Sequence, residues 1–341
     1  MLLDAAINPP DLAAAGSTAA AAERLGLSGL WTSEVQHDPF LPLALAAVQT
    51  ERVQLGTAIA VAFPRSPTVT AYTAWDLARA TQGRFILGLG TQVKAHIERR
   101  FSVPWDAPVP RLRDYIAAMR ALWQTWQTGE RLRHEGPYYT LKLMTPFFDP
   151  GPLDVPPPPV WIAGVNEGLA RMAGEVCDGF LAHPFHSVRY LREALRPWIA
   201  GGLTAAGRPP DALQLSVSTF VIFGAGAVRD RMRAEVQQQI AFYASTPNYA
   251  TVLALHGWEE IGTQLTGLAA RGRWAEMGPL ITDEMLHEFA VEGATFAEAV
   301  GQLPARYAGL ADRVTPYLPF IPGQQDAAWA EAVAAFNTSA A

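Results

Sequence analysis

Four polar side chains that could transfer a proton or bind a negative charge lie just after runs of apolar residues. Glu34 and His37 follow one such run, and Lys94 and His96 follow another. A carboxylate beside an imidazole can move a proton near neutral pH, and a lysine with an imidazole can stabilise an anionic ligand or a developing charge. The alternative for Lys94 and His96 is a solvated loop with scattered charges. We treat all four as candidate catalytic residues.

A possible anion site lies further along the chain. The turn Gly164, Val165 and Asn166 stands between an apolar run and a predicted helix. Free N–H groups at the start of a helix bind anions, although many turns of this kind share the pattern. His183 follows the next apolar run, and we expect it to line a pocket. Its spacing to His186 could suggest a metal, but no companion cysteines or carboxylates lie nearby, so we predict no metal site.

Two other charged residues near these positions have simpler explanations. Asp38 directly precedes Pro39 at the start of a predicted helix, so we expect it to cap that helix. Arg65 could reach an anion, but a surface salt bridge is the favoured interpretation.

Composition excludes several classes of protein. The net charge of −6 argues against a nucleic-acid partner, which requires a clustered basic surface. No apolar run reaches the roughly 18 residues needed to cross a membrane, and the first residues do not resemble a signal peptide. The single cysteine, Cys177, cannot form an internal disulfide, so we expect a reducing cytoplasm. The sequence also lacks the hydrolase serine elbow, the phosphate-binding Walker loop and zinc-binding spacings.

The elements that must position the candidate residues alternate regularly. Eight strand-like runs recur, at Leu2–Ile7, Gly29–Ser33, Val53–Ala60, Phe85–Gly90, Val160–Ala163, Gly179–Ala182, Leu213–Phe223 and Val314–Leu318, and helical patterns separate them. Eight alternations predict an α/β fold of the (β/α)8 TIM barrel type, whose active sites lie at the C-terminal ends of the strands. A doubly wound open sheet would normally have a glycine-rich turn after its first strand. The residues there are Asn8, Pro9 and Pro10, which cannot cradle a pyrophosphate.

Two segments interrupt this alternation. Residues 129–159, before the fifth strand, are rich in proline and aromatic residues, and residues 246–295, before the eighth strand, contain further helical patterns. Both are too long for ordinary loops, so we expect structured insertions over the C-terminal mouth of the barrel. No linker divides the chain, and we predict one domain over residues 1–341.

Glycines mark the end of the fourth strand. Gly83 is placed to stop a helix, and Gly88 and Gly90 lie within the apolar run that follows. Glycine at such positions allows another group to approach the backbone closely. We expect the same of Gly56 on the third strand, where it indicates a bulge or a nearby ligand.

These motifs together resemble a known family. Asp76–Thr91, Gly26–Glu34, Thr50–Thr57 and Ala173–Phe180 are similar to stretches of the luciferase-like monooxygenase superfamily. The likeness is greatest to the branch that uses the deazaflavin coenzyme F420 and includes methylenetetrahydromethanopterin reductases. It implies a barrel whose mouth holds the flavin or deazaflavin ring.

The resemblance also implies roles for particular residues. Ala58 and Ile59 match a bulge with a non-proline cis peptide that backs the ring, the Gly164 turn matches the family's phosphate-holding turn, and Glu34 matches its acidic residue on strand two. The resulting set of cofactor-binding candidates is Thr57, Ala58, Ile59, Gly90, Thr91, Gln92, Gly164, Val165, Asn166 and His183.

The sequence departs from the family pattern at two places. Glu34-Val35 replaces an Asp-His pair, and Gln92 and Val93 stand where one branch has a glutamate proton donor. His37, Lys94 and His96 are the local substitutes.

The resemblance implies an F420-dependent oxidoreductase that transfers a hydride to or from a small organic substrate. The alternatives are an FMN-dependent monooxygenase and a barrel that binds cofactor without turnover. A homodimer is expected because dimers are common in the family.

Overall fold

Eight parallel strands close into a barrel in the computed structural model, which describes residues 1–8 and 11–340. Pro9 and Pro10, used above to argue against an open sheet, lie outside the described residues. The order around the barrel is β1 (Leu2–Ala6), β2 (Gly29–Thr32), β3 (Gln54–Thr57), β5 (Phe85–Gly90), β8 (Val160–Gly164), β9 (Gly179–Ala182), β10 (Gln214–Ile222) and β12 (Arg313–Pro316). β12 pairs with both β10 and β1, which closes the ring. The predicted TIM barrel is confirmed.

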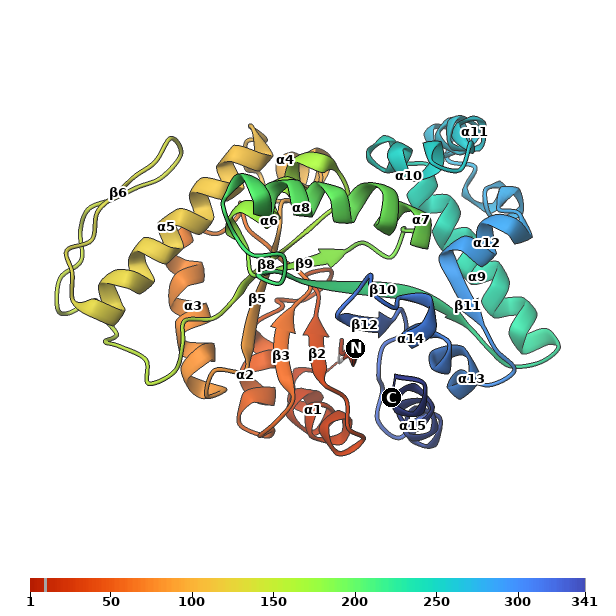
Figure 1. Ribbon diagram of the computed structural model, residues 1–341, viewed down its shortest axis with the longest axis horizontal. Helices are drawn as coiled ribbons and strands as arrows, with labels where there is room; N and C mark the ends of the chain where they lie inside the picture. Colours follow the sequence, from red (N-terminus) through yellow and green to blue (C-terminus); the bar gives the residue numbers. More distant parts are fainter. Residues whose placement is uncertain (9–10, 341) are drawn as a thin grey trace.

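Helices between the strands cover the outside of the barrel (Figure 1). They are α1 (Ala15–Arg24), α2 (Leu41–Ala47), α3 (Pro67–Ala80), α5 (Pro108–Thr128), α6 (Glu167–Val176), α7 (Val188–Tyr190), α8 (Arg196–Ala205), α9 (Ala227–Ala244), α13 (Phe296–Gly301), α14 (Leu303–Arg306) and α15 (Asp326–Ala340). A π-helical stretch, Leu191–Leu195, joins α7 to α8. Ser66 caps α3 through its side chain, and Pro67 occupies the first turn, as such a sequence favours.

Two tryptophans fill the middle of the barrel. Trp31 and Trp161 lie with ring centroids 5.5 Å apart, and Ile86 and Leu181 pack in the same layer. Glycines make room for both rings, because a Cβ atom on Gly56 would lie 2.3 Å from the ring of Trp31. The close approach predicted at Gly56 is therefore made by the protein's own indole.

A buried ion pair joins the two ends of the sheet. Both oxygens of Asp4 on β1 accept hydrogen bonds from the guanidinium of Arg313 on β12, at 2.7 Å each. The indole N–H of Trp31 also donates to Asp4, at 2.9 Å, and Arg313 donates to the side chain of Gln54 on β3. Asp4 and Arg313 are 0% and 1% exposed. The Asp4 carboxylate and the Arg313 guanidinium therefore both have hydrogen-bond partners, as burial of charge requires.

The first inserted segment, residues 129–159, lies beside helices α3 and α5. It contains the short hairpin β6 (His134–Glu135) and β7 (Thr140–Leu141). The carboxylate of Asp114 on α5 binds His134 and the N–H groups of Tyr138 and Tyr139, and Tyr72 on α3 donates to the carbonyl of Phe148.

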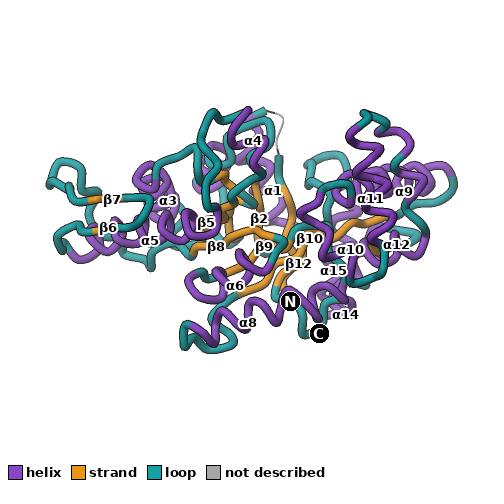
Figure 2. The backbone as a smooth tube through the Cα atoms, turned by 90° about the horizontal axis from the view of Figure 1, so that it is seen from above, coloured by secondary structure: helices purple, strands orange, loops and turns teal. Residues whose placement is uncertain are grey.

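The second inserted segment lies at the other end of the molecule. Figures 1 and 2 both show the barrel between the β6–β7 hairpin and the helices that follow α9. These are α10 (Ala250–Ala254), α11 (Glu259–Ala270) and α12 (Asp283–Phe289), with short 3₁₀ turns, followed by β11 (Ala290–Glu292), which extends the sheet along β10. This segment reaches the mouth through Tyr249, whose ring packs 4.8 Å from that of His183.

Candidate active site

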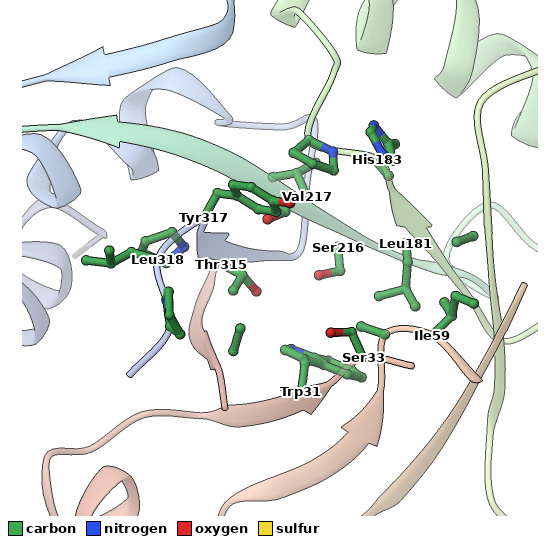
Figure 3. A pocket seen from close by; sticks show the side chains of 18 of the residues that line it. Trp31, Ser33, Ile59, Leu181, His183, Ser216, Val217, Thr315, Tyr317 and Leu318 are labelled. Carbon is green, nitrogen blue, oxygen red and sulfur yellow. The ribbon is translucent and has the colours of Figure 1, made fainter. Parts of the chain in front are cut away.

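A cavity of about 480 Å³ opens at the C-terminal ends of the barrel strands (Figure 3). Its lining comes from every barrel strand but β5, or from the turn that follows the strand. The lining residues are Ala6, Asn8, Trp31, Ser33, Val35, Ala58, Ile59, Ala163, Leu181, Ala182, His183, Pro184, Ser216, Val217, Ser218, Thr315, Pro316, Tyr317, Leu318 and Pro319. This volume is typical of a small-molecule site.

The chain bulges inward after β3, at the point that the resemblance indicated. The peptide bond between Ala58 and Ile59 is cis, and both residues line the cavity. The Ala58 N–H donates to the Thr32 carbonyl at 2.6 Å, and the Ile59 carbonyl accepts from the N–H of Glu34 at 3.1 Å. The short strand β4 (Ala60–Val61) then pairs with the end of β5. The bulge is therefore held on both sides by backbone hydrogen bonds.

Glycines on β5 let this bulge form. A Cβ atom on Gly88 would lie 1.8 Å from the carbonyl oxygen of Thr57, and one on Gly90 would lie 2.6 Å from Cδ1 of Ile59. The Thr57 hydroxyl donates to the Gly88 carbonyl at 2.6 Å and accepts from its N–H at 2.9 Å. Thr57 is fully buried and does not line the cavity, so it supports the bulge from behind.

Glu34 supports the same bulge from the side. Its carboxylate accepts a hydrogen bond of 2.7 Å from the N–H of Val61 and one of 2.6 Å from Arg65. Arg65 also binds Asp38 at 3.0 Å, while the other oxygen of Asp38 accepts from the N–H groups that open α2. Burial alone lowers the pKa of Arg65, but its hydrogen bonds to Glu34 and Asp38 outweigh that effect and raise it. Glu34 is absent from the cavity lining, so its geometry suits a positioning residue.

The other proposed catalytic residues lie away from the cavity. Lys94 and His96 are exposed on α4 (Lys94–Arg99), and Lys94 forms an ion pair of 3.8 Å with Glu98. His37 is exposed and lines a second hollow of about 450 Å³, which shares the lining residues Asn8, Ser33 and Val35 with the main cavity. The structure therefore does not gather these residues around one reacting atom.

Thr91 and Gln92 form the turn between β5 and α4. The side-chain oxygen of Gln92 accepts from the N–H of Val93 at 3.0 Å, and the backbone of Gln92 is left-handed, with φ of 59°. Neither residue is among those that line the main cavity. Their role in holding a cofactor remains a proposal.

The turn after β8 presents an open helix start. Asn166 caps α6 without a side-chain hydrogen bond, and Asn166, Glu167 and Gly168 are exposed. The Val165 carbonyl is held by the hydroxyl of Tyr190 at 2.6 Å. Ala163, just before Gly164, lines the cavity. An anion bound to the backbone N–H groups at the start of α6 would therefore lie next to the cavity. A ligand that joins a ring to a phosphate requires this arrangement.

His183 lines the cavity as expected, in an uncharged form. Burial, with a smaller contribution from His186, lowers its pKa to about 3. Its Nδ1 accepts a hydrogen bond of 3.1 Å from the N–H of Phe185, which leaves the proton on Nε2. Burial also lowers the pKa of His186 to about 4. His186 forms hydrogen bonds with the His183 carbonyl and the Tyr307 hydroxyl, so it links the loop that carries His183 to Tyr307.

Sequence reasoning missed most of the polar groups inside the cavity. Ser216, Ser218 and Thr315 line it, and Figure 3 shows the side chains of Ser216 and Thr315 directed into it. No side-chain hydrogen bond from these three hydroxyls is found within residues 1–8 and 11–340. The sequence signal for them is limited to hydroxyl residues at alternate positions of β10, Ser216 and Ser218, and to Thr315 beside Val314 on β12.

The profile of the luciferase-like monooxygenase family matches residues 3–313 of the chain. The chain therefore belongs to the luciferase-like monooxygenase family. Its relatives and structural neighbours include F420-dependent oxidoreductases and flavin-dependent monooxygenases, and the chain is an enzyme of the oxidoreductase class.

Three similar proteins illustrate the range. The uncharacterized protein Rv1360 of Mycobacterium tuberculosis is 49% identical over 315 residues, which cover 92% of each chain. The 5,10-methylenetetrahydromethanopterin reductase of Archaeoglobus fulgidus is 25% identical over 280 residues, which cover 80% of each chain. The solved structure of the coenzyme F420-dependent tetrahydromethanopterin reductase of Methanopyrus kandleri superposes with a TM-score of 0.76 and 20% identity, covering 97% of each chain.

Within the described residues, no helix is long and apolar enough to cross a membrane.

Proposed function

We propose that this protein is an F420-dependent oxidoreductase that transfers a hydride between the deazaflavin and a small organic substrate. The observation that carries the proposal is the cavity at the barrel mouth, backed by the cis Ala58–Ile59 bulge and adjoining the open start of α6. The 25% identity to a methylenetetrahydromethanopterin reductase over most of both chains supports the same cofactor.

The cavity suits a flat heterocycle with a polar edge. Trp31, Ala58 and Ile59 supply apolar surface, and the hydroxyls of Ser216 and Thr315 supply partners for ring heteroatoms. The N–H groups after Gly164 would hold the phosphate. When bound, the deazaflavin carries the hydride, while the chain orients it and excludes water.

Titration with F420, and separately with FMN, tests the choice of cofactor. Fluorescence and calorimetry should show F420 binding at least tenfold more tightly than FMN. The opposite preference would favour the alternative, an FMN-dependent monooxygenase, which keeps the same cavity and is supported by the family to which the chain belongs. Turnover with an electron donor would exclude binding without catalysis.

Replacement of Gly164 tests the phosphate site. A Cβ atom there would lie 2.8 Å from Cβ of Leu169 and would push the turn away from the helix start. We expect Gly164→Val to weaken F420 binding more than about tenfold while the far-ultraviolet circular dichroism stays that of the parent. Unchanged affinity would mean that the phosphate binds elsewhere.

A homodimer is part of the proposal. Leu41, Leu45 and Val48 are 55%, 39% and 73% exposed and recur at helical spacing on and just after α2, and Val69 on α3 is 56% exposed. Exposed apolar residues in such a row favour contact with another protein surface. Light scattering of the parent protein and of Leu45→Glu should show a dimer and a monomer respectively.

A further inference from the structure

The wall of the cavity opposite the bulge includes the side chains of Tyr317 and Leu318, which directly follow β12. Figure 3 shows Ile59 and Tyr317 on opposite sides of the cavity. Tyr317 directly follows β12, and its ring packs edge-on against Phe220 at 5.0 Å. If the deazaflavin lies against the bulge, as proposed above, the substrate faces the Tyr317 wall.

Tyr317 belongs to a pair of hydroxyls. Its hydroxyl lies 2.9 Å from that of Tyr243 at the end of α9, and the ring of Tyr243 packs 4.5 Å from His183. Two hydroxyls that share one hydrogen bond use one of their two protons, so the pair keeps one O–H free to donate. Tyr317 is 41% exposed, and its partial burial, together with Tyr243, raises the pKa of its phenol, which therefore remains protonated near neutral pH. The pair can therefore donate a hydrogen bond at the edge of the cavity near neutral pH.

The same cavity carries no charge. Within the described part of the chain, its lining includes no lysine, arginine, aspartate or glutamate, and His183 is neutral for the reason given above. A charged substrate would lose hydration here without gaining an opposite charge, which is unfavourable. The lining can instead contact the apolar surface of a substrate and form one or two hydrogen bonds to a neutral oxygen atom.

We propose that this enzyme acts on uncharged carbonyl compounds, or the matching secondary alcohols, whose oxygen is held by the Tyr317–Tyr243 hydroxyl pair. This inference rests on the proposed hydride transfer. In the reduction, the carbonyl carbon takes the hydride of the reduced deazaflavin, and the π electrons of the C=O bond move to oxygen. That oxygen takes the proton of Tyr317, which is restored from solvent through Tyr243. Oxidation of the alcohol is the reverse.

Equilibrium binding to the F420-loaded protein tests the inference without turnover, because oxidised cofactor and ketone do not react. The ligands are acetophenone, its oxygen-free counterpart ethylbenzene, and its anionic counterpart 4-acetylbenzoate. We expect acetophenone to bind at least about tenfold more tightly than 4-acetylbenzoate. Tyr317→Phe should weaken acetophenone binding about fivefold and leave ethylbenzene unchanged, because only one hydrogen bond is lost.

A matched control comes from the same region. Tyr249 also packs against His183, but no hydrogen bond of its hydroxyl is found among the described residues, so Tyr249→Phe should change neither affinity. Equal binding of the ketone and the carboxylate, no binding of acetophenone, or equal losses for acetophenone and ethylbenzene in Tyr317→Phe would overturn the inference.

The cofactor titration separates this failure from failure of the proposed function. If F420 binds but the ligand titrations give any of the overturning results above, the hydride-transfer proposal stands and the proposed substrate class is rejected. If F420 does not bind, the hydride-transfer proposal is rejected. The three ligands are therefore also titrated into cofactor-free and FMN-treated protein, where the same preferences support a neutral carbonyl site and their absence rejects it.

Discussion

The two walls of the cavity are made in different ways. The wall at the bulge after β3 is shaped by backbone: a cis peptide at Ala58–Ile59 fits against Gly88 and Gly90 of β5 behind it and is held by backbone hydrogen bonds. The wall at β12 is formed by side chains, with Tyr317 supported by Tyr243 from a different segment. Changes of side chain can alter the second wall without moving the first.

This difference suits the two ligands. A cofactor shared by many enzymes suits a wall whose shape is set by backbone, and substrates that differ suit a wall whose side chains can be exchanged. The four predictions below test whether the first wall is rigid and the second adjustable.

The largest effect is expected at Gly88. In Gly88→Ala the new methyl would meet the Thr57 carbonyl, which is backbone and cannot move aside cheaply. We expect the free energy of unfolding to fall by about 3 kcal/mol, and F420 binding to be lost. Urea denaturation and cofactor titration measure both. Gly201→Ala on α8 is the control, since the new Cβ would lie 3.7 Å from its nearest neighbour, the side chain of Arg171 on α6, and the change should be neutral or slightly stabilising.

Glu34→Gln should have the next largest effect. The glutamine amide keeps the shape of the carboxylate, and its oxygen can still accept from the N–H of Val61, but it loses the negative charge that pairs with Arg65. We expect a loss of about 2 kcal/mol in unfolding free energy together with weaker cofactor binding. Asp38→Asn is the comparison, because Asp38 is 37% exposed and Asn can still accept from the N–H groups of Phe40 and Leu41, so the loss of unfolding free energy should stay below about 1 kcal/mol. Equal losses would show that the bulge does not depend on Glu34.

The loop of His183 and His186, which packs against Tyr243 of the side-chain wall through His183, should be sensitive to acid. His186 has a pKa of about 4 in the folded protein, lowered by burial from 6.5, so the unfolded chain binds more protons between these values. The unfolding free energy should therefore be unaffected above pH 6.5 and fall as the pH drops below it, by about 2 kcal/mol at pH 5 for this one group. Urea midpoints at pH 7 and 5 should differ less in His186→Gln than in the parent; an unchanged difference would contradict the assignment.

The smallest effects are expected at Lys94 and His96. Both are exposed on α4, away from either wall. Lys94→Ala and His96→Ala should each change the unfolding free energy by less than about 0.5 kcal/mol and F420 affinity by less than about twofold. A tenfold loss in either variant would show that α4 closes over the cofactor, and would restore the role suggested by the sequence.

The sequence predicted the backbone wall better than the side-chain wall. Gly88 and Gly90 indicated a close approach, and the resemblance located the cis bond at Ala58–Ile59; both are confirmed. These features depend on residues near each other in sequence or on adjacent strands. The approaching group, however, is the chain itself and not a ligand.

Tyr317 and the ion pair of Asp4 with Arg313 could not be recognised in this way. Their partners lie 74 and 309 residues away, and nothing local marks them as paired. For Glu34 and Lys94, position after a strand did not determine which way the side chain points. Arg65 turned the carboxylate of Glu34 toward the bulge, and helix α4 turned Lys94 outward.

The ion pair between Asp4 and Arg313 has a consequence for how the protein is made. A ribosome delivers Asp4 early and Arg313 only when almost the whole barrel has been translated. Until then the carboxylate has no guanidinium to meet, and burying it alone would be strongly unfavourable. The nascent N-terminal strands must therefore keep that edge hydrated, and truncated products that stop before β12 are left with an open, polar seam that quality-control proteases can recognise.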